Sequence, residues 1–293
     1  QGHTLKFNWN VGSKSWMAPI KSVTDATIKN LHTEGQITSS TYALSGLVCS
    51  VYGTTAISGC VSNVNLTSSY SGSTCDAAGM AVNIHKDARI TFDDCVVMGT
   101  FNGTESGRAG MSGFVGTFQK GTCILNNCLY LGESNAKSNS SSYTFAPGNA
   151  TINNCYYLNL CGDKQGTQVT KEQLKSGEVT YLLQNKRPEN IWGQLLGTND
   201  EPQLTADDAK KVCKVDFTYK GQLKATRYAT KGKAIFGDMP TVTPQFLLGS
   251  DYNFHHYYRY GFSEYFTAST PVNADRTVGL FIEDRDYYEI ASK

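Results

Sequence analysis

Five similar tetrads recur along the first half of the chain. Each has an apolar residue, two mostly polar residues and then Leu or Cys: Ile28–Leu31, Ile57–Cys60, Phe92–Cys95, Leu125–Cys128 and Ile152–Cys155. Their last positions lie 29, 35, 33 and 27 residues apart. Repetition at this period is typical of a solenoid, in which one coil cannot bury its apolar face alone and stacks on the next. The tetrads therefore predict a stack of about five coils.

A second repeated element precedes the tetrads. Its copies are Ser45–Val48, Ala78–Ala81, Ser112–Val115 and, in degenerate form, Ser142–Phe145. In the first three copies a glycine holds the second position, where a missing Cβ lets the backbone turn, and the next residue is expected to point inward. Short strands separated by turn residues, without helical periodicity, predict a mainly β fold: a right-handed parallel β-helix over residues 1–165.

Four of the nine cysteines, Cys60, Cys95, Cys128 and Cys155, share the last tetrad position. In stacked coils their Cβ atoms lie about one strand spacing apart, roughly 4.8 Å, on parallel vectors. A disulfide needs closer, converging Cβ atoms, and four ligands in a line do not converge on one metal ion. We therefore expect buried free thiols, with no metal and no cofactor.

The residue before each of these positions is Asn30, Gly59, Asp94, Asn127 or Asn154. Asn and Gly tolerate left-handed backbone angles, and stacked Asn amides can hydrogen-bond between coils. A ligand-binding ladder is the alternative interpretation, but turn chemistry is the expectation.

The pattern changes after Cys155. Thr170–Gln173 fits a helical capping box, and Gly177 is expected to break the helix in two. We interpret residues 166–209 as a short helical cap over the last coil, because an open solenoid end exposes its core and strand edges. Residues 210–293 predict a small β domain with strands near 212–219, 225–229, 246–248, 252–260 and 276–282.

Composition limits the function. Lys and Arg total 26 and Asp and Glu total 25, a net charge of +1, so the chain lacks the basic field expected of a nucleic-acid binder. No apolar run approaches the ~20 residues of a transmembrane helix. The opening segment, 1–5, has the pattern of a strand interior, so we expect this sequence to be part of a longer protein.

Several segments resemble a known family. Ser112–Gly116 and Ile152–Tyr156 are similar to the GLUG-type repeats of large bacterial surface proteins, especially those of Bacteroidetes, and 173–183 resembles the helical sequel to such coils. Phe266–Val278 resembles the end of a Listeria–Bacteroides (internalin B-type) repeat, a small β-grasp-like module, although this copy is degenerate. The resemblance implies export to the bacterial cell surface or beyond, an adhesin-like role and no shared catalytic residues.

Enzymes also occur on parallel β-helices, so the acidic residues matter. Asp93 and Asp94 are the only adjacent acidic pair in the repeats. Sugar cleavage needs paired carboxylates, so a polysaccharide lyase or glycoside hydrolase using Asp93 or Asp94 is the alternative function. The companion motifs of the polygalacturonase signature are absent, and neighbouring strand residues point to opposite faces, so we expect no enzyme.

The strongest local signal for binding is the aromatic run, Tyr252–Tyr260. Its rings suit stacking on sugars or a protein interface, and the candidate ligand-binding residues are Tyr252, His255, Tyr257 and Arg259. In the alternative interpretation Phe254, His256, Tyr258 and Tyr260 pack on the domain core. The sequence thus favours a non-catalytic surface protein that binds a glycan or host protein, with a structural stalk or spacer as a further alternative.

Overall fold

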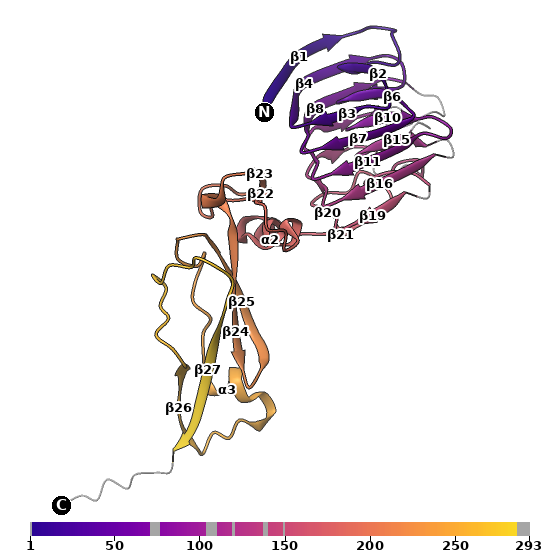
Figure 1. Cartoon of the computed structure of the whole chain (residues 1–293). Helices are drawn as coiled ribbons and strands as arrows, with labels where there is room; N and C mark the ends of the chain where they lie inside the picture. Colours follow the sequence, from indigo (N-terminus) through magenta and orange to yellow (C-terminus); the bar gives the residue numbers. More distant parts are fainter. Residues whose placement is uncertain are drawn as a thin grey trace, which may run out of the picture. The chain divides into compact units, whose positions relative to one another are not determined.

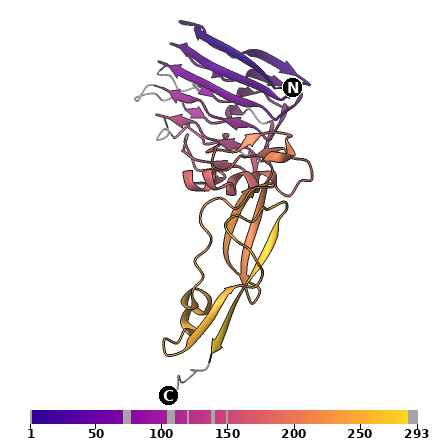
Figure 2. The same ribbon diagram turned by 90° about the vertical axis from the view of Figure 1, so that its left-hand side faces the viewer.

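The computed structural model describes residues 2–70, 77–103, 110–118, 121–136, 140–148 and 150–285. The chain divides into two compact units, Gln1–Thr170 and Lys171–Lys293. The first is a parallel β-solenoid whose strands stack coil upon coil, as Figures 1 and 2 show. The second carries the helices and a smaller sheet. The mainly β class and the solenoid predicted from the tetrads are thereby confirmed.

Four parallel sheets build the described solenoid. The largest contains β1 (His3–Asn10), β4 (Leu31–Ser39), β8 (Val61–Ser68), β12 (Val96–Val97), β13 (Thr100–Asn102), β17 (Leu129–Tyr130), β18 (Glu133–Ser134), β20 (Tyr156–Tyr157) and β21 (Thr167–Gln168). The second contains β3 (Thr27–Lys29), β7 (Thr54–Ser58), β11 (Arg89–Asp93), β16 (Thr122–Asn126) and β19 (Thr151–Asn153). The third contains β2 (Ile20–Thr24), β6 (Val48–Tyr52), β10 (Ala81–Ile84) and β15 (Val115–Phe118), and the fourth β5 (Leu44–Ser45), β9 (Ala77–Ala78) and β14 (Met111–Ser112).

The tetrads stack in register. Their first residues face one another along the second sheet, in the order Ile28, Ile57, Phe92, Leu125 and Ile152. The three inner members of this row are completely buried. Because a one-residue slip would turn the whole row outward, burial of these side chains fixes the pairing of the strands.

The corner residues have the backbone that the sequence predicts. Asn30, Gly59, Asp94, Asn127 and Asn154 all have φ between 49° and 62°. The Nδ2 of Asn154 donates to the Oδ1 of Asn127 at 2.8 Å, so the side chains also link neighbouring coils. This confirms turn chemistry with interstrand amide bonds at the corner.

The cysteine column is a row of buried free thiols, as expected. Each sulfur lies 3.2–3.4 Å from the carbonyl oxygen two residues earlier and 3.5–3.8 Å from that of the first tetrad residue in the preceding coil. Burial raises the pKa of Cys128 well above its usual value, which keeps that thiol protonated. Cys49, Cys123, Cys161 and Cys213 are also buried and free, and Cys75 lies outside the described residues.

The repeated glycines mark close contacts between coils. A Cβ on Gly79 would lie 2.2 Å from the carbonyl oxygen of Gly113, and one on Gly113 would lie 2.0 Å from that of Thr144. The fourth copy of this element is displaced by one residue from the prediction: Ser112 pairs with Tyr143, so the copy is 143–146. The rings determine this register, because Phe145 is buried with its ring 5.3 Å from that of Phe114.

The second unit begins with the helical segment. It contains α1 (Lys171–Ser176), α2 (Glu178–Gln184), β22 (Trp192–Gly193), β23 (Gln203–Leu204) and a 3-10 turn at Asp208–Lys210. Gly177 separates the two helices with φ 88°, as predicted. The main chain of Leu196 donates to Thr230 Oγ1 at 2.9 Å, which ties this segment to the sheet of the same unit. The helices therefore group with residues 210–293, and their covering of the last coil stays a prediction.

The sheet of the second unit is β-grasp-like. Its elements are β24 (Val212–Tyr219), β25 (Gln222–Thr230), α3 (Pro244–Leu248), a 3-10 turn at Gly249–Asp251, β26 (Tyr257–Phe262) and β27 (Arg276–Arg285). The strand order is β25-β24-β27-β26, with β24 and β27 parallel in the centre and antiparallel partners outside. The strand predicted near 246–248 is wrong: Thr243 caps a helix there by accepting from the main chain of Phe246, and Pro244 starts it.

Candidate functional site

The aromatic run leads into β26, an edge strand of the described sheet. Only Tyr257–Phe262 forms the strand, which pairs with β27, whereas residues 252–256 form the approach to it. Tyr257 and Phe254 are 69% and 75% exposed. Two large rings therefore lie exposed close together in the sequence at the start of this edge strand, where neighbouring apolar groups form a candidate contact surface.

The predicted site residues lie at the surface of this edge. His255, Tyr257 and Arg259 are exposed, and Tyr252 is half-buried with its ring 5.9 Å from that of Tyr258. The phenyl ring of Phe254 lies 3.8 Å from the imidazole of His255. The structure therefore places the four candidates along one short stretch, within reach of a common partner.

The alternative interpretation, that alternate residues of the run pack on the core, is wrong for most of them. Phe254, His256 and Tyr260 are exposed, and only Tyr258 is half-buried. Alternate residues of a strand are buried only where another layer covers that face of the sheet. The core of this unit is formed by other residues, such as Phe217 and Val278.

Charged residues on the neighbouring strand position the run. Asp284 pairs with the imidazole of His256, and Glu283 lies 3.6 Å from the guanidinium of Arg259. The same guanidinium lies 5.6 Å from the centre of the Phe281 ring. The sequence does not indicate which strand lies beside β26, so these partners on β27 could not be predicted. Sequence reasoning also missed Tyr265, which is 91% exposed.

Asp93 and Asp94 both take part in the stacking of the solenoid. The Oδ1 of Asp93 accepts from Asn126 Nδ2 at 2.8 Å, and Asn126 Oδ1 accepts from Asn153 Nδ2 at 2.9 Å. Asp94 is 7% exposed at a left-handed corner, with φ 54°. Neither carboxylate lines a hollow described in this unit. One such hollow, about 590 Å³, is lined by Asn102, Asn135, Asn159 and Gln168, with Glu133 as the only carboxylate in its described lining.

Comparison with protein-family models, curated proteins and solved structures finds no match to this chain. No helix in the described part of the chain is long and apolar enough to cross a membrane.

Proposed function

We propose that this chain is an exported, non-catalytic, adhesin-like protein of the bacterial cell surface, and that the aromatic run binds a glycan. The observation that carries the proposal is the exposure of Phe254 and His255, just before the edge strand β26, together with that of Tyr257 and Arg259 on it. Leaving such rings in water forgoes the stabilisation that burial gives, about 1.5–3 kcal/mol for a side chain of this size. Binding of a partner recovers that stabilisation.

The chemistry of the run favours a glycan over a protein partner. Tyr257 offers an apolar ring with a hydroxyl tip, and Arg259 and His255 add hydrogen-bonding groups within the same stretch. Sugars present both apolar C–H faces, which stack on aromatic rings, and hydroxyl groups, which accept hydrogen bonds from donors such as Arg259. A host protein remains the alternative partner for the same surface.

The solenoid serves as the scaffold in this proposal. Its polar rows are occupied by contacts between coils, as at Asp93 and Asn126, which supports a non-catalytic role. A glycosidase needs two carboxylates facing one substrate, and the described solenoid hollow has one, Glu133. The GLUG-like and internalin-type resemblances support the surface location.

A glycan array combined with a polysaccharide-cleavage screen tests the proposal. We expect the intact chain to bind particular glycans, Tyr257→Ala and Arg259→Ala to weaken that binding about tenfold each, and no polysaccharide to be cleaved. Tyr265→Ala is the matched control, because it removes an exposed Tyr of the same unit outside the run. Polysaccharide cleavage by the intact chain that is lost in Asp94→Ala would overturn the non-catalytic assignment. The absence of both binding and cleavage would favour a structural spacer.

A further inference from the structure

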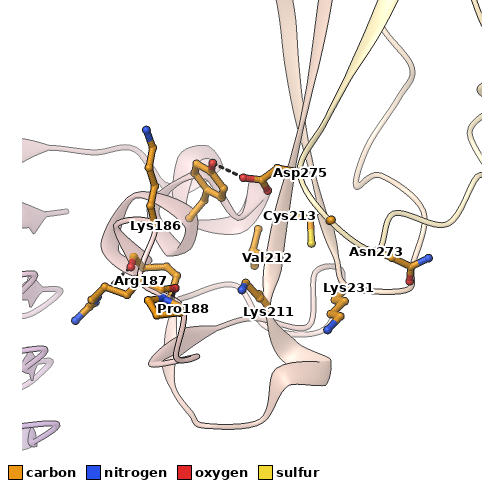
Figure 3. Close-up of a pocket in the computed structure, with 12 residues that line it drawn as sticks. Lys186, Arg187, Pro188, Lys211, Val212, Cys213, Lys231, Asn273 and Asp275 are labelled. Atoms are coloured by element: carbon orange, nitrogen blue, oxygen red, sulfur yellow. Dashed lines mark hydrogen bonds between the residues drawn. The ribbon is translucent and has the colours of Figure 1, made fainter.

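A second hollow lies within the second unit, at the far end of β27 from the aromatic run. It measures about 500 Å³ and is lined by the end of α2, the start of β24, the end of β25 and the residues before β27. Figure 3 shows Lys186, Arg187 and Pro188 on one side, Lys231 and Asn273 on the other, and Lys211 between them. This volume is in the usual range for small-molecule sites.

The lining of this hollow is cationic although the chain is nearly neutral. Lys186, Arg187, Lys211 and Lys231 contribute four positive charges, and Asp275 is the only carboxylate in the described lining. Lys231 pairs with Asp208 nearby. Lys186 and Lys211 have no ion-pair partner among the described residues. A positive potential in a concave surface concentrates anions.

Asp275 is held by protein donors. Its Oδ2 accepts from the hydroxyl of Tyr181 at 2.6 Å, and its Oδ1 accepts from the main-chain N–H of Lys214 at 2.8 Å. Figure 3 shows the first of these bonds at the upper edge of the hollow. Asp275 therefore fixes one wall, and among the described residues it forms no ion pair with Lys186 or Lys211.

The opposite wall is held by hydrogen bonds within the chain. Gln184, 5% exposed, donates to the carbonyls of Arg187 and Glu189 and accepts from the N–H groups of Ile191 and Trp192. The guanidinium of Arg187 donates to the carbonyls of Leu183 and Gln184 at the end of α2. A charged wall fixed in advance loses little conformational entropy on binding.

We propose that this hollow is an anion-binding site that takes a carboxylate, sulfate or phosphate group of a small ligand. Lysine ammonium groups form charge-assisted hydrogen bonds with such oxyanions, and the ring of Tyr181 with Pro188 and Val212 provides apolar contact for the rest of the molecule. This site is independent of the glycan proposal, because the register of β27 separates Asp275 from the Tyr257 partner Arg285 by ten residues, about 33 Å of strand.

The test is a titration of the full chain, followed by amide chemical shifts, with three probes: inorganic phosphate, sulfate and glucuronate. We expect saturable shifts at Lys211, Cys213 and Asn273 with a Kd on the order of 1 mM. The double variant Lys186→Gln/Lys211→Gln should weaken binding at least tenfold. The probe bound most tightly identifies the group recognised, and preference for glucuronate over the two inorganic ions indicates contact beyond the charge.

The matched control is Lys220→Gln/Lys224→Gln, which removes the same charge from the hairpin between β24 and β25. We expect its affinity to stay within twofold of the unchanged chain. Equal weakening in both variants would show that net charge alone attracts the anion. That result, or shifts spread over the surface without saturation, would overturn the proposal.

Discussion

The inside of the solenoid and the β26 edge of the second unit use similar residues in opposite ways. In the solenoid, Phe92 is fully buried and its ring meets Phe114 edge-on, while the amide rows link successive coils. At the β26 edge, Phe254 and Tyr257 stand in water. The difference indicates that the solenoid side chains contribute to stability by burial, whereas the exposed rings at the edge contribute little to it; in the proposed function they are available to a partner.

The sharpest test of this contrast replaces one phenylalanine in each region. Phe92→Ala should lower the free energy of unfolding by about 3–5 kcal/mol, since it removes a buried ring and leaves a cavity. Phe254→Ala should change it by less than about 0.5 kcal/mol, since the ring is exposed. Urea unfolding of the full chain measures both, and equal effects would break the contrast.

The next test uses glycine. Gly79→Ala places a Cβ against the carbonyl oxygen of Gly113, so we expect a loss of roughly 1–3 kcal/mol in unfolding free energy. Gly261→Ala, in β26, meets its nearest atom at 3.5 Å and should be close to neutral. Urea unfolding measures both variants. If Gly79→Ala left the free energy of unfolding unchanged, the coils would be able to separate at this corner.

A corner asparagine gives a smaller effect. Asn127→Ala loses the amide bond from Asn154 and places Ala in a left-handed conformation, with an expected cost of about 1–2 kcal/mol. Asn127→Gly keeps the backbone free and should cost about half as much, from the lost hydrogen bond alone. Thermal melts compare the two variants, and an equal loss would assign the whole effect to the side chain.

The smallest effect concerns a buried thiol at high pH. Burial raises the pKa of Cys123 from 9.0 to about 12, so the folded state keeps its proton while the unfolded state releases it. The stabilisation is complete below pH 9 and is lost as the pH rises from there towards 12, about 1 kcal/mol by pH 10. The difference in unfolding free energy between the unchanged chain and Cys123→Ala should therefore be about 1 kcal/mol smaller at pH 10 than at pH 8. If the unfolding free energies of the unchanged chain and of Cys123→Ala change equally with pH, the protonation of Cys123 does not contribute to the pH dependence.

Sequence reasoning succeeded where a residue type has one structural use. The tetrads, the left-handed corners and the thiol column could be read directly, because stacking repeats the same environment in each coil. At α3 the expectation of a strand was wrong although the helix start is encoded locally, by the capping Thr243 and by Pro244. The cationic hollow was also invisible, because Lys186, Lys211 and Lys231 are brought together only by the fold.

The in-register rows have a consequence for how such a chain can change its length. Each inner coil pairs through its main chain with the coils on both sides at the same positions, and Asn126 adds a side-chain link between Asp93 and Asn153. Duplicating or deleting one whole coil leaves equivalent partners on both sides of the junction. Tandem duplication of a gene segment encoding about 30 residues can therefore lengthen the solenoid while the main-chain pairing continues across the junction.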